Sequence, residues 1–222
     1  MRLRSILARV CVLLHTESLT YVDACIADRH HPVADDLDRY GWSMRHRFLS
    51  TGLTRALALE CRALACAGAL QPAHVGQAGA RVWRPDVRGD QICWLEPGQS
   101  LACDCFLAEM DALRIVLNRE LCLGLADYEG HFACYAPGAC YAPHRDQFRH
   151  DDRRVVTVIV YLNDAWRSAQ GGALRLHPER DAAVDVTPLG RRIVVFMSGS
   201  MLHEVLPATR KRLSIAGWFR RR

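Results

Sequence analysis

The pattern of apolar residues changes character near residue 131, and this change limits the folds open to the chain. Before it, apolar residues recur at helical spacing over 53–67 and 101–123, and a glycine follows each stretch. A proline at the first position and two early acids predict a shorter helix over 32–40. After it come short β-branched and aromatic runs interrupted by Gly, Pro and Asp. We expect strands over 155–162, 173–177, 184–186, 192–196 and 213–219.

Helices followed by strands favour an α+β fold, with an antiparallel β core and helices on one of its faces. A chain of 222 residues has room for one well-cored domain rather than two. Half of the residues are apolar and a quarter are charged, which excludes a mainly disordered protein. No run approaches the roughly 18 apolar residues of a membrane span. We expect a poorly ordered extension over 1–31 and a single domain over 32–222.

Charge and cysteine usage indicate neither a nucleic-acid-binding protein nor a disulfide scaffold. Of the 29 basic residues all but one are arginine, and they are scattered except for a cluster at 220–222. The ten cysteines lack the C-x2-C spacing of a zinc site, and a chain of this length needs no disulfides to hold a core. We interpret them as free thiols, as expected for a cytoplasmic protein.

Three residues of the second half could share one metal ion. His144 and Asp146 are two residues apart, so on an extended segment their side chains point the same way. A distant histidine, His203, would complete a set of two imidazoles and one carboxylate, which leaves three coordination positions open and suits Fe(II). An H-x-D pair alone is weak, because such pairs are common and His144 could be an ordinary loop histidine.

Arg212 stands immediately before the last predicted strand, which we expect to run beside the His203 segment. A guanidinium can bind a carboxylate through two hydrogen bonds, so Arg212 could hold one end of a dicarboxylate whose other end chelates the metal. The alternative is that Arg212 lies with Arg210 and Lys211 on a solvated edge. Spacing and strand context favour the ligand-binding role.

Taken together, these motifs resemble a known family. The segments that carry the likeness are H-x-D, VTVIVYLNDAW, GGALRLHPE, HEV-P and the arginine before a tryptophan-containing strand. They resemble the iron- and 2-oxoglutarate-dependent prolyl hydroxylases. The upstream segments YGWSMRHRFLS at 40–50 and DVRGDQICWLE at 86–96 are similar to bacterial relatives of the animal hypoxia-sensing enzymes. The likeness covers about 34–220 and implies a distorted double-stranded β-helix, or jelly roll, buttressed by N-terminal helices.

The resemblance also implies roles for individual residues. His144, Asp146 and His203 match the iron ligands, Arg212 and Tyr161 match the residues that bind the distal carboxylate of 2-oxoglutarate, and Tyr135 matches a tyrosine near the co-substrate and iron. Both tyrosines could instead be core aromatics. Gly171 and Gly172 fit a turn that approaches other backbone closely, or a plain hairpin.

The segment from His74 to Arg88 matches a mobile loop that covers substrate in this family. Trp83 within it is interpreted as a recognition residue, although it could instead cap the core. Asp90 and Arg154 stand where the family pairs a loop acid with a strand arginine, with a plain surface location as the alternative. The histidines at 150 and 177 are interpreted as ordinary surface residues.

The activity implied by the resemblance is hydroxylation of a prolyl residue of a protein. Fe(II) is the expected cofactor, 2-oxoglutarate the co-substrate that yields succinate and CO2, and ascorbate the reductant. A translation elongation factor is the first candidate substrate. Ala216 replaces a threonine of the animal oxygen sensors, which puts slow, sensor-like oxygen chemistry in doubt. An oxygenase acting on nucleic acid or a small molecule is the alternative, and the intact iron triad argues against a non-catalytic binding module.

Overall fold

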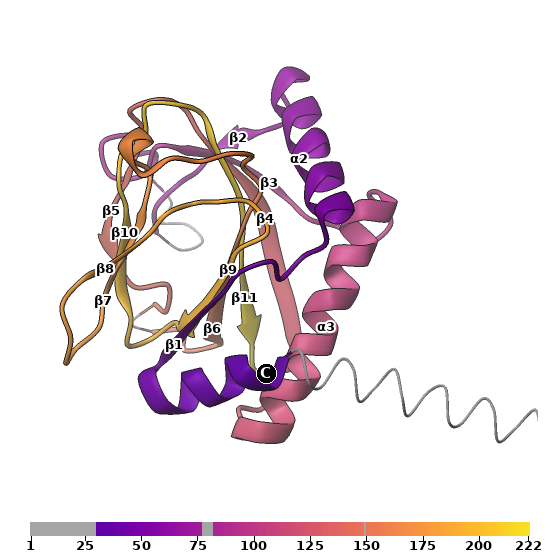
Figure 1. The fold of residues 1–222 in the computed structure, drawn as a ribbon, viewed down its shortest axis with the longest axis vertical. Coiled ribbons are helices and arrows are strands. Elements are labelled where there is room, and N and C mark those ends of the chain that lie inside the picture. Colours follow the sequence, from indigo (N-terminus) through magenta and orange to yellow (C-terminus); the bar gives the residue numbers. More distant parts are fainter. Residues whose placement is uncertain (1–29, 77–81, 149) are drawn as a thin grey trace, which may run out of the picture.

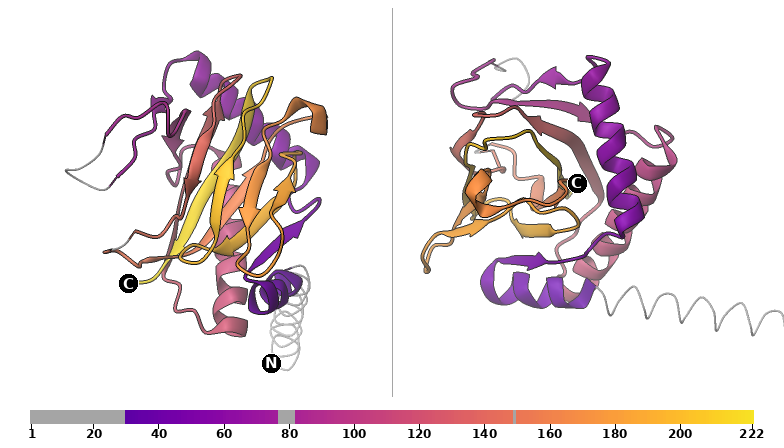
Figure 2. Two further views of the ribbon diagram at one scale, coloured as in Figure 1. Left: turned by 90° about the vertical axis from the view of Figure 1, so that its left-hand side faces the viewer. Right: turned by 45° about the horizontal axis from the view of Figure 1, so that its top comes forward.

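The computed structural model describes residues 30–76, 82–148 and 150–222, so the predicted extension over 1–31 lies almost wholly outside the described residues. Two antiparallel sheets face each other, and helices pack on the outer side of the larger sheet (Figures 1 and 2). This is the α+β jelly-roll arrangement that the sequence predicts. The sheets leave a cleft between them, in which the candidate site lies.

Seven of the described strands form the larger sheet. In spatial order they are β1 (Trp42–Arg45), β9 (Ile193–Met197), β6 (Arg154–Tyr161), β11 (Arg212–Arg220), β4 (Asp127–Tyr135), β3 (Asp90–Trp94) and β2 (Gln71–Pro72). The smaller sheet contains β5 (Tyr141–His144), β10 (Leu202–Val205), β7 (Leu174–His177) and β8 (Val184–Val186). The helices are α2 (Thr51–Cys66), α3 (Leu101–Leu121), a helix over 30–40 and a short 3-10 turn, η2 (Ser168–Gln170).

Side-chain caps set where the two long helices begin. The Ser50 hydroxyl accepts a hydrogen bond from the Leu53 N–H at 3.1 Å, so α2 starts two residues earlier than its apolar pattern predicts. Ser100 caps α3 in the same way through the Cys103 N–H. That helix ends at Cys122, whose φ of 52° is left-handed, slightly before the predicted end.

The helix over 30–40 is already formed at His30, two residues before the predicted start at Pro32. His30 is fully buried, and its ring centroid lies 5.3 Å from that of Phe48. Contact with the core therefore extends the helix beyond its proline.

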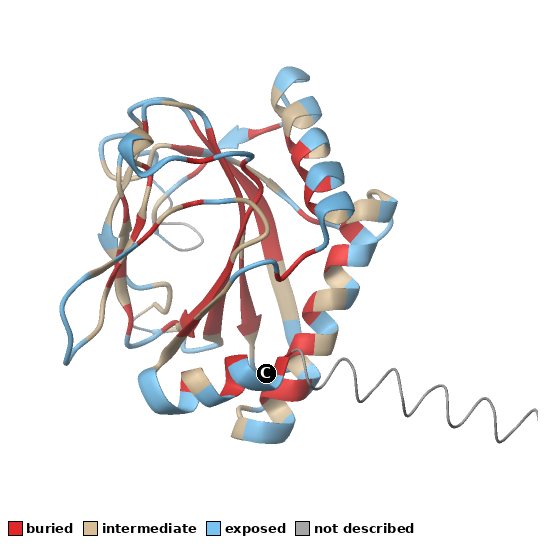
Figure 3. Cartoon of the chain, viewed as in Figure 1, coloured by how far each residue is buried: buried red, intermediate tan, exposed pale blue. Residues whose placement is uncertain are grey.

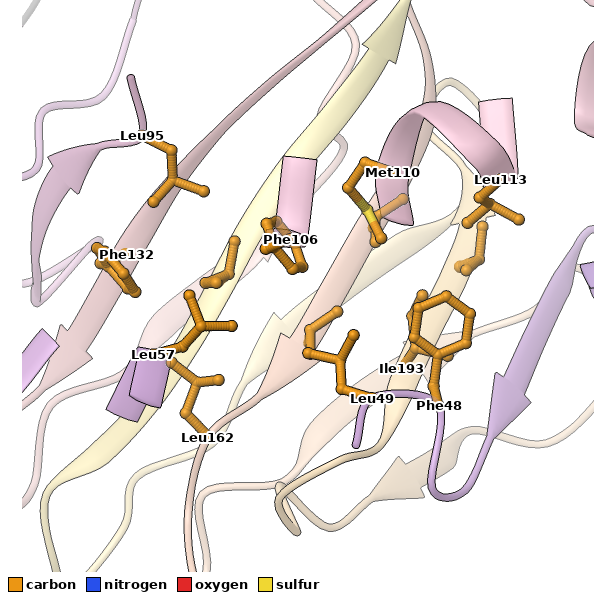
Figure 4. Close-up of a cluster of buried hydrophobic side chains, with 14 of the residues drawn as sticks. Phe48, Leu49, Leu57, Leu95, Phe106, Met110, Leu113, Phe132, Leu162 and Ile193 are labelled. Atoms are coloured by element: carbon orange, nitrogen blue, oxygen red, sulfur yellow. The ribbon is translucent and has the colours of Figure 1, made fainter. Parts of the chain in front are cut away.

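The main core lies between the helices and one face of the larger sheet. Alternate residues of the central strands point to it, as the period of two in a strand requires. Figure 4 shows Phe132 of β4 among the helix residues Leu57, Phe106 and Met110, all four of them buried. Burial concentrates along these central strands and the inner sides of α2 and α3 (Figure 3).

One expectation about strand order is wrong. The last strand, β11, does not run beside the His203 segment. It pairs with β4 and β6 in the larger sheet, whereas β10, which carries His203, pairs with β5 and β7 in the smaller sheet. Residues from β10 and β11 meet across the cleft rather than as hydrogen-bonded neighbours, because the sheets face each other.

Candidate metal and co-substrate site

His144, Asp146 and His203 meet between the two sheets. Antiparallel pairing of β5 with β10 sets His144 directly opposite His203, and Asp146 follows two residues after β5. Nε2 of His144 lies 3.5 Å from one Asp146 carboxylate oxygen, and Nε2 of His203 lies 3.5 Å from the other. The ligand atoms of all three lie within 4.8 Å of one another. Two nitrogen ligands and one oxygen ligand suit Fe(II), because they leave its other coordination positions open.

Backbone carbonyls fix the tautomer of both histidines. Nδ1 of His144 donates to the Ala142 carbonyl at 2.8 Å, and Nδ1 of His203 donates to the Met201 carbonyl at 3.2 Å. A carbonyl only accepts, so Nδ1 carries the proton in each ring and Nε2 keeps a free lone pair. Both free lone pairs belong to the nitrogens that face Asp146.

The electrostatics keep Asp146 and His203 in the protonation states that a metal requires. Burial alone would raise the pKa of Asp146, but the neighbouring His203 and His144 outweigh this effect and hold that pKa well below its usual range. Burial lowers the pKa of His203 to about 4. At neutral pH the carboxylate is charged and the His203 imidazole is neutral, as metal ligation demands.

Arg212 is buried beside this group rather than on a solvated edge. Its guanidinium carbon lies 5.1 Å from the ring centroid of Tyr135 and 5.2 Å from that of Tyr161. Nε donates to the Gly172 carbonyl at 3.0 Å and Nη1 donates to the Ser214 hydroxyl at 3.2 Å. Of its basic neighbours, Lys211 is exposed and Arg210 is half-buried, so the solvated-edge alternative does not hold for Arg212.

Two donors beside the Tyr135 and Tyr161 rings are buried and have no hydrogen-bond partner among the described residues. They are Nη2 of Arg212 and the hydroxyl of Tyr161. Burial raises the pKa of Tyr161, so its phenol keeps its proton and remains a donor. Leaving such groups unpaired costs about 1–3 kcal/mol each, and a carboxylate would satisfy both at once. The pocket therefore fits the distal carboxylate of 2-oxoglutarate, with the metal ligands across the cleft.

The adjacent glycines support the close-approach interpretation rather than a plain hairpin. Gly171 and Gly172 have φ values of 67° and 71°, in the left-handed region. A Cβ on Gly171 would lie 2.4 Å from the Pro207 carbonyl oxygen, and one on Gly172 would lie 2.9 Å from the Ala208 Cβ. The backbone can come near enough for the Gly172 carbonyl to hold Arg212 because neither residue carries a side chain.

The expected pair between Asp90 and Arg154 is not formed. The buried Asp90 carboxylate accepts hydrogen bonds from Arg88 at 2.8 and 3.1 Å. Arg154 instead contacts Glu129 at 2.9 Å, and its guanidinium lies 3.4 Å from the Trp218 ring centroid. Residues two apart lie on the same side of an extended segment, so Arg88 reaches Asp90 locally.

Two contacts of the metal-ligand candidates have no counterpart in the sequence motifs. The Tyr141 ring stacks on His144 at 3.6 Å, and Arg88 lies 4.9 Å above the same tyrosine ring. Thr157 donates to Asp146. The only signal in the sequence for Thr157 is its register, because it stands four residues before Tyr161 on the same face of β6.

The remaining candidates lie around the site or away from it. A cleft of about 1100 Å³ runs from the metal-ligand group past Ala216, Trp94 and Trp218. Trp83 is 59 % exposed, so it does not cap the core. His150 is exposed and the half-buried His177 contacts Glu204. All eight cysteines among the described residues are unpaired. None of the described helices has the length and apolar character to cross a membrane.

Comparison with known proteins identifies the family. Residues 130–220 match the family model of the 2OG-Fe(II) oxygenase superfamily. Human prolyl hydroxylase EGLN3 is 30% identical over 192 residues, which cover 82% of this chain and 80% of that protein. Mouse Egl nine homolog 1 is 35% identical over 145 residues, and the chain spans only 35% of its length.

Two solved structures share the fold over most of the chain. A Pseudomonas putida prolyl-4-hydroxylase has a TM-score of 0.80 and 49% identity, with 86% of this chain and 98% of that chain covered. A Trichoplax adhaerens prolyl hydroxylase, in complex with a hypoxia inducible factor oxygen degradation domain peptide fragment, has a TM-score of 0.80 and 28% identity, with 90% and 93% covered. The chain therefore belongs to the iron- and 2-oxoglutarate-dependent prolyl hydroxylase family.

Proposed function

We propose that this 2-oxoglutarate-dependent dioxygenase hydroxylates a prolyl residue within a protein substrate. One observation carries the proposal. An open cleft contains the metal-ligand group, and at its buried end the Arg212 Nη2 and Tyr161 hydroxyl are unpaired donors that a carboxylate would satisfy. The relatives are prolyl hydroxylases, and the Trichoplax enzyme binds a peptide. The same proposal assigns residues 32–222 to one catalytic domain.

In this proposal His144, Asp146 and His203 hold Fe(II) through their free Nε2 atoms and a carboxylate oxygen. Bound iron would supply the oxidation of 2-oxoglutarate by dioxygen to succinate and CO2, with one oxygen atom of dioxygen entering succinate and the other entering the C–H bond of a prolyl carbon. Arg212 and Tyr161 bind the distal carboxylate. Tyr135 packs against the guanidinium and keeps water away from it. No side chain acts as a nucleophile.

The segment 74–90 is proposed to choose the substrate. Residues 74–76, Arg88 and Asp90 of this segment line the cleft, and residues 77–81 lie outside the described part of the chain. Trp83 offers a large exposed aromatic surface. Trp83→Ala should impair hydroxylation of the protein substrate and leave 2-oxoglutarate affinity nearly unchanged. Leu101→Ala, at an 81% exposed position on α3, is the matched control. A parallel loss of 2-oxoglutarate binding in Trp83→Ala would contradict the recognition role.

Mass spectrometry of cell lysate incubated with the enzyme, Fe(II) and 2-oxoglutarate tests the proposal. We expect an added oxygen atom on a proline of one protein, absent with Asp146→Ala and absent without 2-oxoglutarate. A purified translation elongation factor is the first single substrate to assay, with and without ascorbate. A substrate of this kind fits the proposed cytoplasmic location of the enzyme. Oxidation of an oligonucleotide or a small molecule, without any on proline, would replace this function by the alternative one.

A further inference from the structure

Two buried hydroxyl groups lie behind the carboxylate of Asp146. Thr157 Oγ1 donates to Asp146 Oδ2 at 2.8 Å, and it lies 2.8 Å from the hydroxyl oxygen of Ser198. Thr157 is 1% exposed and Ser198 is fully buried. Water therefore cannot substitute easily for either partner.

The directions of these two hydrogen bonds follow from counting protons. Thr157 donates its hydroxyl proton to the Asp146 carboxylate, whose oxygen is the acceptor. A hydroxyl has a single proton, which leaves Thr157 Oγ1 only as an acceptor toward Ser198. Ser198 is then the donor to Thr157. The two hydrogen bonds therefore run in one direction, from Ser198 through Thr157 to Asp146, and each bond strengthens the next.

The backbone holds the Thr157 and Ser198 hydroxyl groups in place from both sides. Thr157 lies on β6, where β9 and β11 flank it. Ser198 directly follows β9, and its N–H donates to the Val155 carbonyl at 2.9 Å. The Ser198 carbonyl accepts from the Gln147 N–H at 3.3 Å, next to Asp146. The hydroxyl groups are therefore fixed to the scaffold rather than to the metal ligands alone.

We infer that Thr157, oriented by Ser198, is a positioning residue that makes Asp146 a single-oxygen metal ligand. The inference rests on the proposed function, because it takes Asp146 to be a metal ligand. The bond to Thr157 engages Oδ2, the oxygen nearer His203, whereas Oδ1 faces His144 and stays available to the metal. A carboxylate without this restraint can turn and bind through both oxygens, which would fill one of the positions that the co-substrate and dioxygen need.

The test compares Mn(II) binding by Thr157 variants, because Mn(II) is a redox-stable probe whose free form is counted by electron paramagnetic resonance. Valine matches threonine in size and suits a buried strand, so Thr157→Val removes only the hydroxyl. Loss of a hydrogen bond to a metal ligand typically weakens affinity 10–100-fold, and we expect about tenfold or more. Thr157→Ser should restore wild-type affinity. Ser198→Ala should have a smaller effect, because Thr157 can still donate to Asp146.

Thr54→Val is the matched control, because Thr54 is a buried threonine whose hydroxyl donates to the Ser50 carbonyl at 2.9 Å, far from the site. Its Mn(II) affinity should equal that of wild type. If Thr157→Val destabilises the metal-free protein, Thr157→Ala is compared with Thr157→Ser instead. A folded, hydroxyl-free variant with wild-type Mn(II) affinity overturns the inference. Wild-type protein that binds no Mn(II), or binds it as well after Asp146→Ala, would instead refute the proposed metal site.

Discussion

The two faces of strands β4, β6 and β11 alternate along one sequence, yet their chemistry differs. Toward α2 and α3 they present apolar side chains such as Phe132, Val158 and Ile215. Toward the smaller sheet they present Thr157 and Arg212 beside apolar residues such as Ile159. Neighbours in sequence therefore belong to different environments. One face holds the fold and the other holds the chemistry, so substitutions should separate stability from ligand binding.

The largest effect is expected from a substitution on the cleft side, which should abolish activity and leave the fold intact. Asp146→Ala removes the only carboxylate among the three metal-ligand candidates, and we expect iron-dependent oxidation of 2-oxoglutarate to cease. Succinate formation is the measurement, with circular dichroism as a check on folding. Full activity in this variant would contradict the assignment of the metal ligands.

On the helix side the expected effect is on stability. Phe132 is fully buried among helix residues, so Phe132→Ala should lower the free energy of unfolding by about 3–5 kcal/mol. Urea denaturation measures this change. The 2-oxoglutarate affinity of the folded variant should stay near that of wild type. A large loss of affinity would show that the two faces are not separable.

On the cleft side, Arg212→Met should have the opposite outcome and reduce ligand binding rather than stability. Losing a charge-assisted contact with the distal carboxylate should weaken 2-oxoglutarate binding by about 2 kcal/mol, roughly thirtyfold. Arg210→Ala is the control, since Arg210 lies over Trp166 rather than in the pocket. Isothermal titration with a redox-inactive metal measures both. Equal weakening by the two substitutions would remove the special role of Arg212.

The smallest effect concerns thiol reactivity, which reports how well the core between the helices and the larger sheet is protected from solvent. Burial raises the pKa of Cys61 to about 12, so this thiol should resist alkylation in the folded protein. The exposed Cys66, Cys105 and Cys122 should react quickly under the same conditions. In urea without reductant all ten cysteines should titrate as thiols. Several disulfide bonds would contradict both the interpretation of the cysteines as free thiols and the proposed cytoplasmic location.

Elements with long or strongly alternating patterns could be predicted from the sequence. This holds for α2, α3, β6 and β11, but not for the nine-residue β4, which is absent from the expected strands. The edge strands β1 and β2 have too few residues to show a period. Strand partners could not be predicted, because a local pattern carries no information on what lies beside it. The expected neighbourhood of β10 and β11 was wrong for this reason.

The same division applies to the site. The metal-ligand candidates and Arg212 stand in recognisable motifs, so the sequence alone predicts them. The bond from Thr157 to Asp146 depends on strand register and loop path, so spacing alone does not predict it. The spacing of Arg88 and Asp90 allows their contact, but it does not exclude Arg154 as the partner of Asp90.

The position of β11 has a consequence for biosynthesis. It lies between β4 and β6 and follows both in the chain, and within the described residues it alone joins the β4–β3–β2 half of the larger sheet to the β6–β9–β1 half. During synthesis on the ribosome the two halves cannot be joined by hydrogen bonds until β11 has been made. Such long-range strand pairing is slow. Arg212 is the first residue of that strand. A nascent chain without β11 therefore lacks Arg212, the residue proposed to bind the distal carboxylate of 2-oxoglutarate.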